Sequence, residues 1–419
     1  MDLNLRHLRA FAAVVAQGSL TKAAAVCAIS QPAVTQAVAK LEAQLAARLL
    51  DRTPAGVFPT AVGRRFAERV ERALERLDTT CAAIAPRLTL TVTNAQLEAL
   101  IAVREAGNFT LAARGMGLAQ PTVHRTIARL ETDAGRPLFT RDRRGVTATR
   151  AGDNLASAAR LAFAELAQAC MEIEEHAGRD AGQIVIGALP LSRSFGLPQA
   201  IVRFRERWPK TALKIVSGSY RELLPGLRRG DIDLIVGALR NPPPIDDIEQ
   251  RPVFDDGLVV VASPAHPLAG EPRLEVAQLL HYPWVVAGHG TPTRGHFDRV
   301  VASSAETPLS IVETSSLILM REILVISDYL GFVSRRQAEA EARSGTLAVL
   351  AVALPGTSRQ IGITTRAGWK PTRSQADFLA IIDRIGSLHA PGRGRDGRAD
   401  EKTDAPTEDD ERAPALPVG

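Results

Sequence analysis

The stretch QPAVTQAVAKLE at residues 31–42 occurs again as QPTVHRTIARLE at residues 120–131. The similarity extends without a gap over Leu8–Gly63 and Leu97–Gly152, a constant shift of 89 positions. Roughly a third of the aligned residues are identical, and residues of similar volume fill most other apolar positions. We therefore expect one folding unit to have been built twice.

Each repeat has the pattern of three helices followed by a hairpin. In the first repeat, apolar residues at helical spacing run up to Gly18, and Ser19 and Ser30 are suited to cap the second and third helices. Pro32 fits the first turn of the third helix, where its missing N–H costs nothing. With residues 52–60 as a hairpin, the pattern predicts a helix-turn-helix with a wing.

The third helix of each repeat would present amide, hydroxyl and basic side chains to the edges of bases in a major groove. The candidates for DNA contact, with those of the wings, are Gln31, Pro32, Thr35, Gln36 and Arg52 in the first repeat and Gln120, Pro121, Thr122, His124, Arg125, Arg141, Arg143 and Arg144 in the second. Alternatively, Gln31 and Gln120 are solvated residues at a helix start, and Arg143 and Arg144 belong to an ordinary exposed turn.

The positive charge of the chain is concentrated on the repeats. Residues 1–152 hold 21 Lys and Arg against 12 Asp and Glu, whereas the residues from Pro391 onward hold 5 against 8. A basic excess of this kind suits a polyanionic partner such as double-stranded DNA. A basic surface that is merely solvated is the alternative.

Residues 95–152, and less closely 3–63, resemble the winged helix-turn-helix of LysR-type transcriptional regulators. The residues that carry the resemblance are Ala112-Ala113, QPTV at 120–123, the 127–131 stretch, Gly135, PLF at 137–139, Arg141 and the 147–152 end. The first repeat departs from the family pattern at Ala46, Arg48 and Leu50, where the family has Gly, Pro and Phe. One such unit is usual in the family, so the second is the feature to be explained.

Each repeat runs into a long amphipathic helix, about 62–84 and about 152–176. An apolar seam with charged flanks suits pairing with the same helix of a second chain. The resemblance implies the same role, because in the family this linker helix dimerises the DNA-binding modules. Packing of the two helices on each other within one chain is the competing interpretation.

From Gln183 the pattern changes to alternating strands and helices, with strands expected at 184–186, 213–216, 233–236, 258–262, 284–286, 330–333 and 359–364 and helices at 197–208 and 220–229. This alternation predicts βαβ units, a parallel sheet and a ligand near the carboxyl ends of the strands. This half resembles the effector domain of the same regulators, which has the fold of type 2 periplasmic solute-binding proteins. The matching segments are 184–189, 197–198, 204–209, 223–234, 266–268 and 331–333. The expected fold class is α+β multidomain: two all-α-rich winged helix-turn-helix domains followed by a two-lobed α/β domain. The expected boundaries are 1–61 and 95–150 for the two winged units, 62–87 for the first linker helix, 151–178 for the linker or dimerisation helix, 182–389 for the effector domain and 390–419 for a disordered tail.

Loops around the cleft of such a domain would hold a small molecule through hydroxyls and backbone N–H groups. The candidates are Leu191, Ser192, Arg193, Ser194, Thr291, Thr293, Arg294, Thr314, Ser315 and Ser316. Helix capping for the hydroxyls, and structural ion pairs for Arg193 and Arg294, are the alternatives. The 190–194 run also resembles the subgroup named for regulators of galactose-binding proteins, which suggests a sugar or a related polar metabolite.

Other function classes lack their motifs. No phosphate-binding Gly-Lys-Ser/Thr loop, no Gly-x-Ser-x-Gly elbow and no His-Glu-x-x-His is present, so we expect no enzyme, no cofactor and no metal. The three cysteines, Cys27, Cys81 and Cys170, have no metal-ligand spacing. Neither a membrane span nor a signal peptide is evident, so a transport component is disfavoured and a cytoplasmic location is expected.

The sequence therefore predicts an effector-responsive transcription factor. Its expected partners are double-stranded DNA and a small-molecule effector, with RNA polymerase as a further candidate. The expected assembly is a homodimer or a homotetramer.

Overall fold

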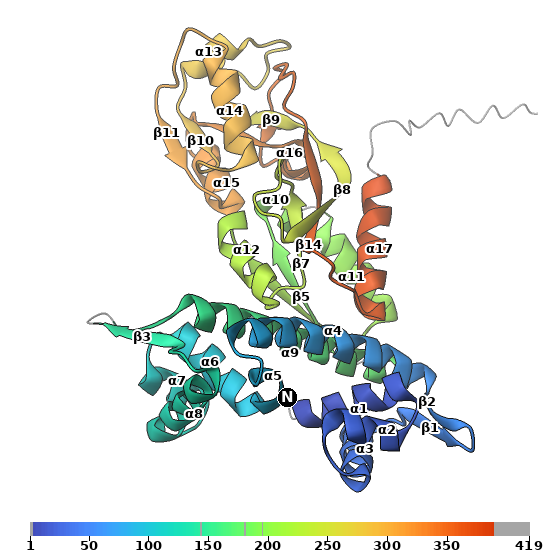
Figure 1. The fold of residues 1–419 in the computed structure, drawn as a ribbon. Coiled ribbons are helices and arrows are strands. Elements are labelled where there is room, and N and C mark those ends of the chain that lie inside the picture. The colour runs from blue at the N-terminus through green and yellow to red at the C-terminus, as the bar shows by residue number, and fades with distance from the viewer. Residues whose placement is uncertain (1–2, 143–144, 180–181, 195, 389–419) are drawn as a thin grey trace, which may run out of the picture.

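The computed structural model describes residues 3–142, 145–179, 182–194 and 196–388. The candidates Arg143 and Arg144 and the tail expected at 390–419 lie outside these ranges, and the side chains of Arg141 and Ser194 are likewise not described. Two small helical units lie at opposite ends of a pair of long helices, and an α/β part stands on the other side of that pair (Figure 1).

Both repeats form three helices and a two-stranded hairpin, as expected. Unit 1 contains α1 (Leu5–Gln17), α2 (Leu20–Cys27), α3 (Gln31–Leu45), β1 (Leu50–Thr53) and β2 (Gly56–Pro59), and unit 2 contains α6 (Asn94–Ala106), α7 (Phe109–Gly115), α8 (Gln120–Ala134), β3 (Phe139–Asp142) and β4 (Gly145–Ala148). The predicted caps are confirmed: Ser19 and Ser30 accept hydrogen bonds from Lys22 N and Ala33 N, and Gly18 ends α1 in a left-handed conformation.

Residues that are identical in the two repeats make the same contacts in both. One carboxylate oxygen of Glu42 accepts hydrogen bonds from Leu49 N and Leu50 N at 2.8 and 3.1 Å, and Glu131 does the same for the equivalent pair at 2.7 and 3.1 Å. These bonds join the third helix to the start of the hairpin. At Gly63 and Gly152 a Cβ would lie 1.9 and 2.1 Å from the carbonyl oxygen of Leu49 and Leu138, so only glycine fits.

The repeats differ in the residues that occupy their two left-handed turn positions. Unit 2 has Gly117 and Gly135 there, with φ of 65° and 66°, whereas unit 1 has Ala28 and Ala46, with φ of 54° and 47°. The turn geometry of unit 1 is therefore kept, although a residue with a Cβ costs about 1–2 kcal/mol in this conformation.

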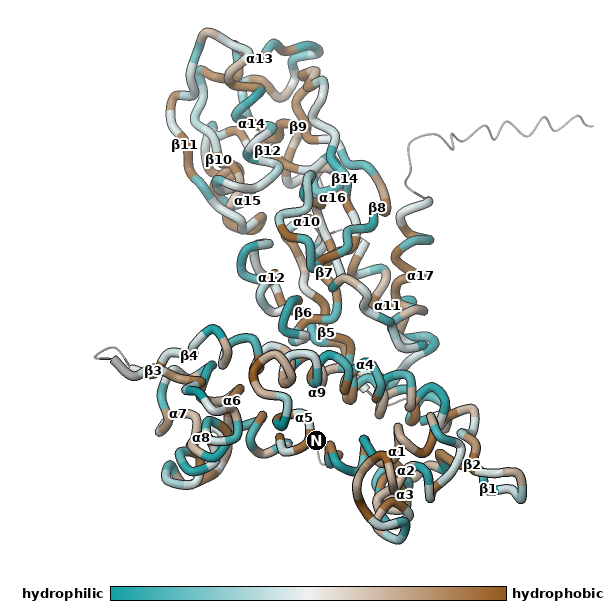
Figure 2. Tube along the Cα trace, in the orientation of Figure 1, coloured by the Kyte–Doolittle hydropathy of each residue, from teal (hydrophilic) through white to brown (hydrophobic). Residues whose placement is uncertain are grey.

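The long helices α4 (Ala61–Ile84) and α9 (Arg150–His176) pack on each other along their lengths. A short helix, α5 (Leu88–Thr91), leads from α4 into unit 2. In Figure 2 both long helices alternate between brown and teal, as expected for helices with one apolar side. One hydrophobic cluster contains buried residues of both units and of both long helices. The packing within one chain that the sequence left as an alternative is thus the arrangement found.

The α/β part has two lobes, each built on a five-stranded sheet. Lobe I contains β5 (Gln183–Ala188), α10 (Pro190–Ser194), α11 (Leu197–Arg207), β6 (Ala212–Ser217), α12 (Tyr220–Arg229), β7 (Leu234–Ala238), β8 (Ile248–Asp256), β14 (Arg359–Arg366) and α17 (Arg373–Ser387), in the strand order β6-β5-β7-β14-β8. Lobe II contains β9 (Leu258–Ala262), α13 (Val276–Leu280), β10 (Trp284–Val286), α14 (Pro292–Ala302), β11 (Ile311–Glu313), α15 (Leu317–Val325), β12 (Leu330–Ser334), α16 (Arg335–Arg343) and β13 (Ala348–Val349), in the order β11-β10-β12-β9-β13.

The prediction of a parallel sheet was right for part of each lobe only. β5, β6 and β7 are parallel, as are β10, β11 and β12. β14 returns from lobe II and inserts antiparallel between β7 and β8, and β9 runs antiparallel to β12 and β13, so both sheets are mixed. The chain crosses between the lobes twice, at Gly257 and before Arg359, which places a hinge beside these residues.

Lobe I is fastened to α9 by polar contacts. The Glu175 carboxylate accepts hydrogen bonds from the Thr372 hydroxyl and from Arg373 N, both at 3.1 Å, and so caps the start of α17. Arg160, further back on α9, pairs with Asp231. Lobe I is therefore tied to the helix pair that carries the two units.

Among the described residues, no helix is both long enough and apolar enough to cross a bilayer.

The strain in the turn of unit 1 gives a test of the fold. Ala46 is exposed, so Ala46→Gly removes little packing while it relieves the left-handed conformation. We expect the free energy of unfolding to rise by about 0.5–1 kcal/mol, because the relief exceeds the extra entropy of glycine in the unfolded chain. Urea unfolding measures the change.

Gly135→Ala is the matched control: its Cβ would meet nothing within 4 Å, yet we expect a loss of about 1 kcal/mol. Equal stability of both variants and the parent would contradict this account.

Candidate DNA-binding and effector-binding sites

The DNA-contact candidates of α3 lie on its outer surface. Gln31, Pro32 and Gln36 are exposed and Thr35 is half-buried, whereas Val34 and Val38 between them are buried in the core of unit 1. The Thr21 hydroxyl donates a hydrogen bond to Gln31 Oε1 at 3.4 Å. The sequence prediction of an outward polar face is therefore met, and Arg52 is exposed on β1 of the wing.

In unit 2 the candidates of α8 are placed in the same way. Gln120, Pro121 and Arg125 are exposed, and Thr122 is half-buried. The His124 ring is exposed but lies against Phe109, with ring centroids 5.3 Å apart. Arg141 lies on β3 of the wing. Both third helices lie on the side of the long helix pair away from the α/β part, near its two ends (Figure 1).

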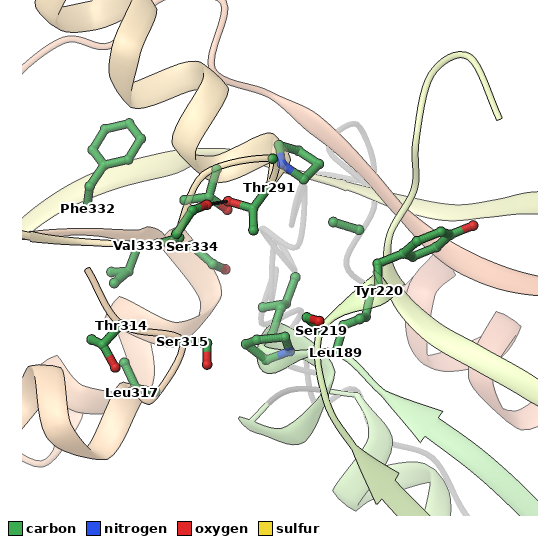
Figure 3. Close-up of a pocket in the computed structure, with 18 of the residues that line it drawn as sticks. Leu189, Ser219, Tyr220, Thr291, Thr314, Ser315, Leu317, Phe332, Val333 and Ser334 are labelled. Carbon is green, nitrogen blue, oxygen red and sulfur yellow. Dashed lines mark hydrogen bonds between the residues drawn. The ribbon is translucent and has the colours of Figure 1, made fainter. Parts of the chain in front are cut away.

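A cavity of about 340 Å³ lies between the two lobes. Figure 3 shows Leu189, Ser219 and Tyr220 on one side and Thr291, Thr314, Ser315 and Phe332 on the other. Four helices begin at this cavity: α10, α12, α14 and α15 have their first residues in its lining. Helix starts direct backbone N–H groups and the positive ends of helix dipoles toward the space, which favours an anionic or strongly polar ligand.

Arg359 joins the two walls of the cavity. It is the first residue of β14, and its guanidinium contacts the Asp256 carboxylate at 3.4 Å and the Thr293 hydroxyl of lobe II. Its Nε has no hydrogen-bond partner in the described part of the chain. Burial lowers the pKa of this guanidinium and Asp256 opposes the shift, yet arginine keeps its charge in proteins. The cavity therefore has a buried cation with donor capacity to spare.

Arg240 supplies a second cation. Its guanidinium carbon lies 4.7 Å from the centre of the Tyr220 ring. No carboxylate of the described residues forms an ion pair with it. Burial lowers the pKa of Arg240, and the positive charge of Arg359 lowers it further. Two guanidinium groups thus face one space, and among the described residues only that of Arg359 is paired with a carboxylate, Asp256.

The structure separates the predicted effector residues into two groups. Leu191, Thr291, Thr293, Thr314, Ser315 and Ser316 line the cavity. Ser192 is instead buried and donates its hydroxyl to Leu189 O at 2.8 Å, and Arg193 is exposed outside the lining. Arg294 forms ion pairs with Asp298 and Glu313, at 2.6 and 2.5 Å, which is the structural alternative that the sequence left open.

Sequence reasoning missed the residues that give the cavity its charge. Arg240 and Arg359 lie far apart in the sequence, which predicts Arg359 only as the first residue of a strand. The strand that Arg359 begins mixes polar and apolar residues and has an arginine at each end, so nothing local marks Arg359 as a cavity residue.

Comparison with known proteins places the chain in a family. The family of LysR substrate binding domains matches residues 177–385, and the family of bacterial regulatory helix-turn-helix proteins of the lysR type matches residues 5–64 and again 95–153. The chain belongs to the LysR family of transcriptional regulators. Its members are DNA-binding regulators with an effector-binding domain rather than enzymes, which confirms the function predicted from the sequence.

Several curated relatives share most of this LysR-family chain. The transcriptional regulator GalR of Pseudomonas putida is 33% identical over 386 residues, which cover 91% of this chain and 97% of that protein. The uncharacterised regulator YdcI of Escherichia coli is 31% identical over 64% of this chain and 88% of its own. Full-length OxyR of Pseudomonas aeruginosa has a similar fold, with a TM-score of 0.53 at 21% identity over 71% of this chain and 95% of that chain.

Proposed function

We propose that both helical units of this regulator bind double-stranded DNA. The observation that carries the proposal is the repeated placement of the polar outer faces of α3 and α8. Both begin with an exposed Gln-Pro pair, and both are held to a wing by the same glutamate contact. Basic residues supply phosphate contacts and so an affinity that depends on salt, while the third helices contact bases. The relative GalR supports a double unit, because the 9% of this chain that its alignment leaves out is shorter than either unit.

We propose further that the effector is a small organic anion with an apolar portion. Arg240 and Arg359 supply the positive charge, and four helix starts add to it. Leu191, Met320 and Phe332 supply apolar surface in the same cavity. A neutral sugar, which the sequence suggested, would leave the Arg240 guanidinium without a charged partner, since only Arg359 has one, Asp256, among the described residues.

Binding at this place can reach the DNA-binding units. Arg359 lies at the hinge and already contacts Thr293 across the cavity, so an anion between the lobes changes how they close. Lobe I is fastened to α9, and α9 packs on α4. Closure therefore moves lobe II relative to lobe I, the long helices and the two units, which are held together.

The two helix-start glutamines test DNA binding by each unit. We expect Gln120→Ala and Gln31→Ala each to weaken binding to a selected duplex about five- to tenfold, since a specific base contact contributes about 1–3 kcal/mol. Each should remove protection from a different part of the footprint. Glu98→Ala, exposed on α6, is the control and should leave the footprint unchanged. A footprint unaltered by Gln31→Ala would contradict DNA binding by unit 1.

The charge of the cavity predicts which ligands stabilise the protein. We expect benzoate or succinate at millimolar concentration to raise the Tm, and galactose to leave it unchanged. Arg240→Gln should weaken the carboxylate effect at least fivefold, whereas Arg193→Gln, exposed outside the cavity, should not alter it. Thermal unfolding monitored by fluorescence checks both. A Tm that galactose raises and that carboxylates leave unchanged would contradict the proposed organic anion and indicate a sugar.

A further inference from the structure

We infer that the two units of one chain act as the two halves of a DNA-binding dimer, so that a single chain recognises two different half-sites on one face of a duplex. The inference rests on the proposal that both units bind DNA. It adds that the packing of α4 on α9 fixes the two units relative to each other within one chain. Two α4 helices, or two α9 helices, could not form the same contact.

The long helices are related by an approximate twofold axis. Arg69 of α4 bonds to Gln168 of α9 at 2.7 Å. Arg69 lies five positions before Leu74, and Gln168 lies five positions after Phe163, the residue that corresponds to Leu74 in the second repeat. The antiparallel crossing therefore centres on equivalent residues, as the crossing of two identical helices in a symmetric dimer would.

A second contact joins equivalent residues of the two units. Leu5 N donates a hydrogen bond to Asn94 Oδ1 at 3.0 Å, and Asn94 Nδ2 donates to Leu3 O at 2.7 Å. Leu5 and Asn94 are equivalent positions of the two repeats, 89 residues apart. Contact between equivalent residues is what a twofold axis requires, so the units are placed as two halves of one symmetric arrangement.

The helix contact is nevertheless specific for unlike partners. Arg69 is 2% exposed and pairs with Glu172 at 2.6 Å and with Glu165 at 3.2 Å, while Arg72 reaches Glu165 at 3.1 Å. Burial opposes the charge of Arg69, but hydrogen bonds and attraction from these glutamates outweigh it and raise its pKa. All the arginines of this cluster come from α4 and all its carboxylates from α9.

Pairing of like helices would break this cluster. In a pair of two α4 helices, the positions of Glu165 and Glu172 would be taken by Arg76 and Ala83, so Arg69 would be buried against a like charge. In a pair of two α9 helices, Ala158 would replace Arg69 and leave the glutamates without a cation. The cluster therefore favours α4 with α9 and disfavours both homotypic pairs.

The length of α4 is comparable to one turn of DNA. The 24 residues of α4 span about 36 Å at about 1.5 Å per residue, and half-sites one helical turn apart are separated by about 34–36 Å. Both third helices lie on the same side of the pair (Figure 1). Because α3 and α8 carry different outer side chains, such as Thr35 against His124, the two half-sites differ in sequence.

The spacing of the half-sites tests the inference with the unmodified full chain. A duplex is first selected from a random library by the protein, and about 5 base pairs, half a helical turn, are then inserted between its two protected patches. We expect the affinity to fall at least tenfold. The insertion turns one half-site to the opposite face of the duplex, where a unit held by the fixed helix pair cannot reach it. An unchanged affinity, or a selected duplex with one protected patch, would overturn the inference. Absence of any selected duplex would instead overturn the proposed function.

The charge cluster supplies a second test. Arg69→Glu adds a carboxylate beside Glu165 and Glu172, and we expect the penalty of the insertion to shrink below threefold because the units lose their fixed spacing. Exchanging all the charges of the cluster, with Arg69→Glu and Arg72→Glu combined with Glu165→Arg and Glu172→Arg, should restore it, because Arg72 also pairs with Glu165. Circular dichroism of each variant shows whether the helices are retained. A helical Arg69→Glu protein that keeps the full penalty would contradict the role of the cluster.

Discussion

The packing of α4 on α9 is the contact on which the rest of the structure depends. It joins the cores of the two units into one hydrophobic cluster, and it carries the polar contacts that fasten lobe I. At its centre a buried guanidinium is held by two carboxylates of the other helix. Removing one partner from such a group leaves a buried charge uncompensated, at a cost of about 3–5 kcal/mol, so any pairing of helices that lacks one partner is penalised.

A duplication changes what a single chain can do. Two copies of one unit need no second molecule to place two recognition helices, and each copy is then free to diverge. Unit 2 keeps glycine at its left-handed turns, and unit 1 keeps the same turns with alanine. The differences on the outer faces of α3 and α8, in contrast, alter no core contact, because the buried positions between them remain apolar. Divergence at the surface with an unchanged core is what we expect of two units that bind different sequences.

The sequence predicted most of the fold because its local signals are strong. Helix caps such as Ser19 and Ser30, and the 89-residue repeat, placed the elements of both units, and α12 was placed with its exact bounds. β8 was missed because Pro252 lies inside it, at the irregularity in its pairing with β14. The pairing of α4 with α9 was left open, since an amphipathic pattern indicates an apolar face without identifying what covers it. The charge of the cavity was missed because it depends on Arg240 and Arg359, which only the tertiary fold brings together.

The most direct test of the account is the mass of the protein–DNA complex. Sedimentation or native mass spectrometry of the full chain with its selected duplex, at protein concentrations just above the Kd, gives the number of chains on one two-half-site element. We predict one chain per element, with both patches protected at that stoichiometry. A complex in which two chains are needed before either patch is protected would contradict the view that one chain is a complete pair.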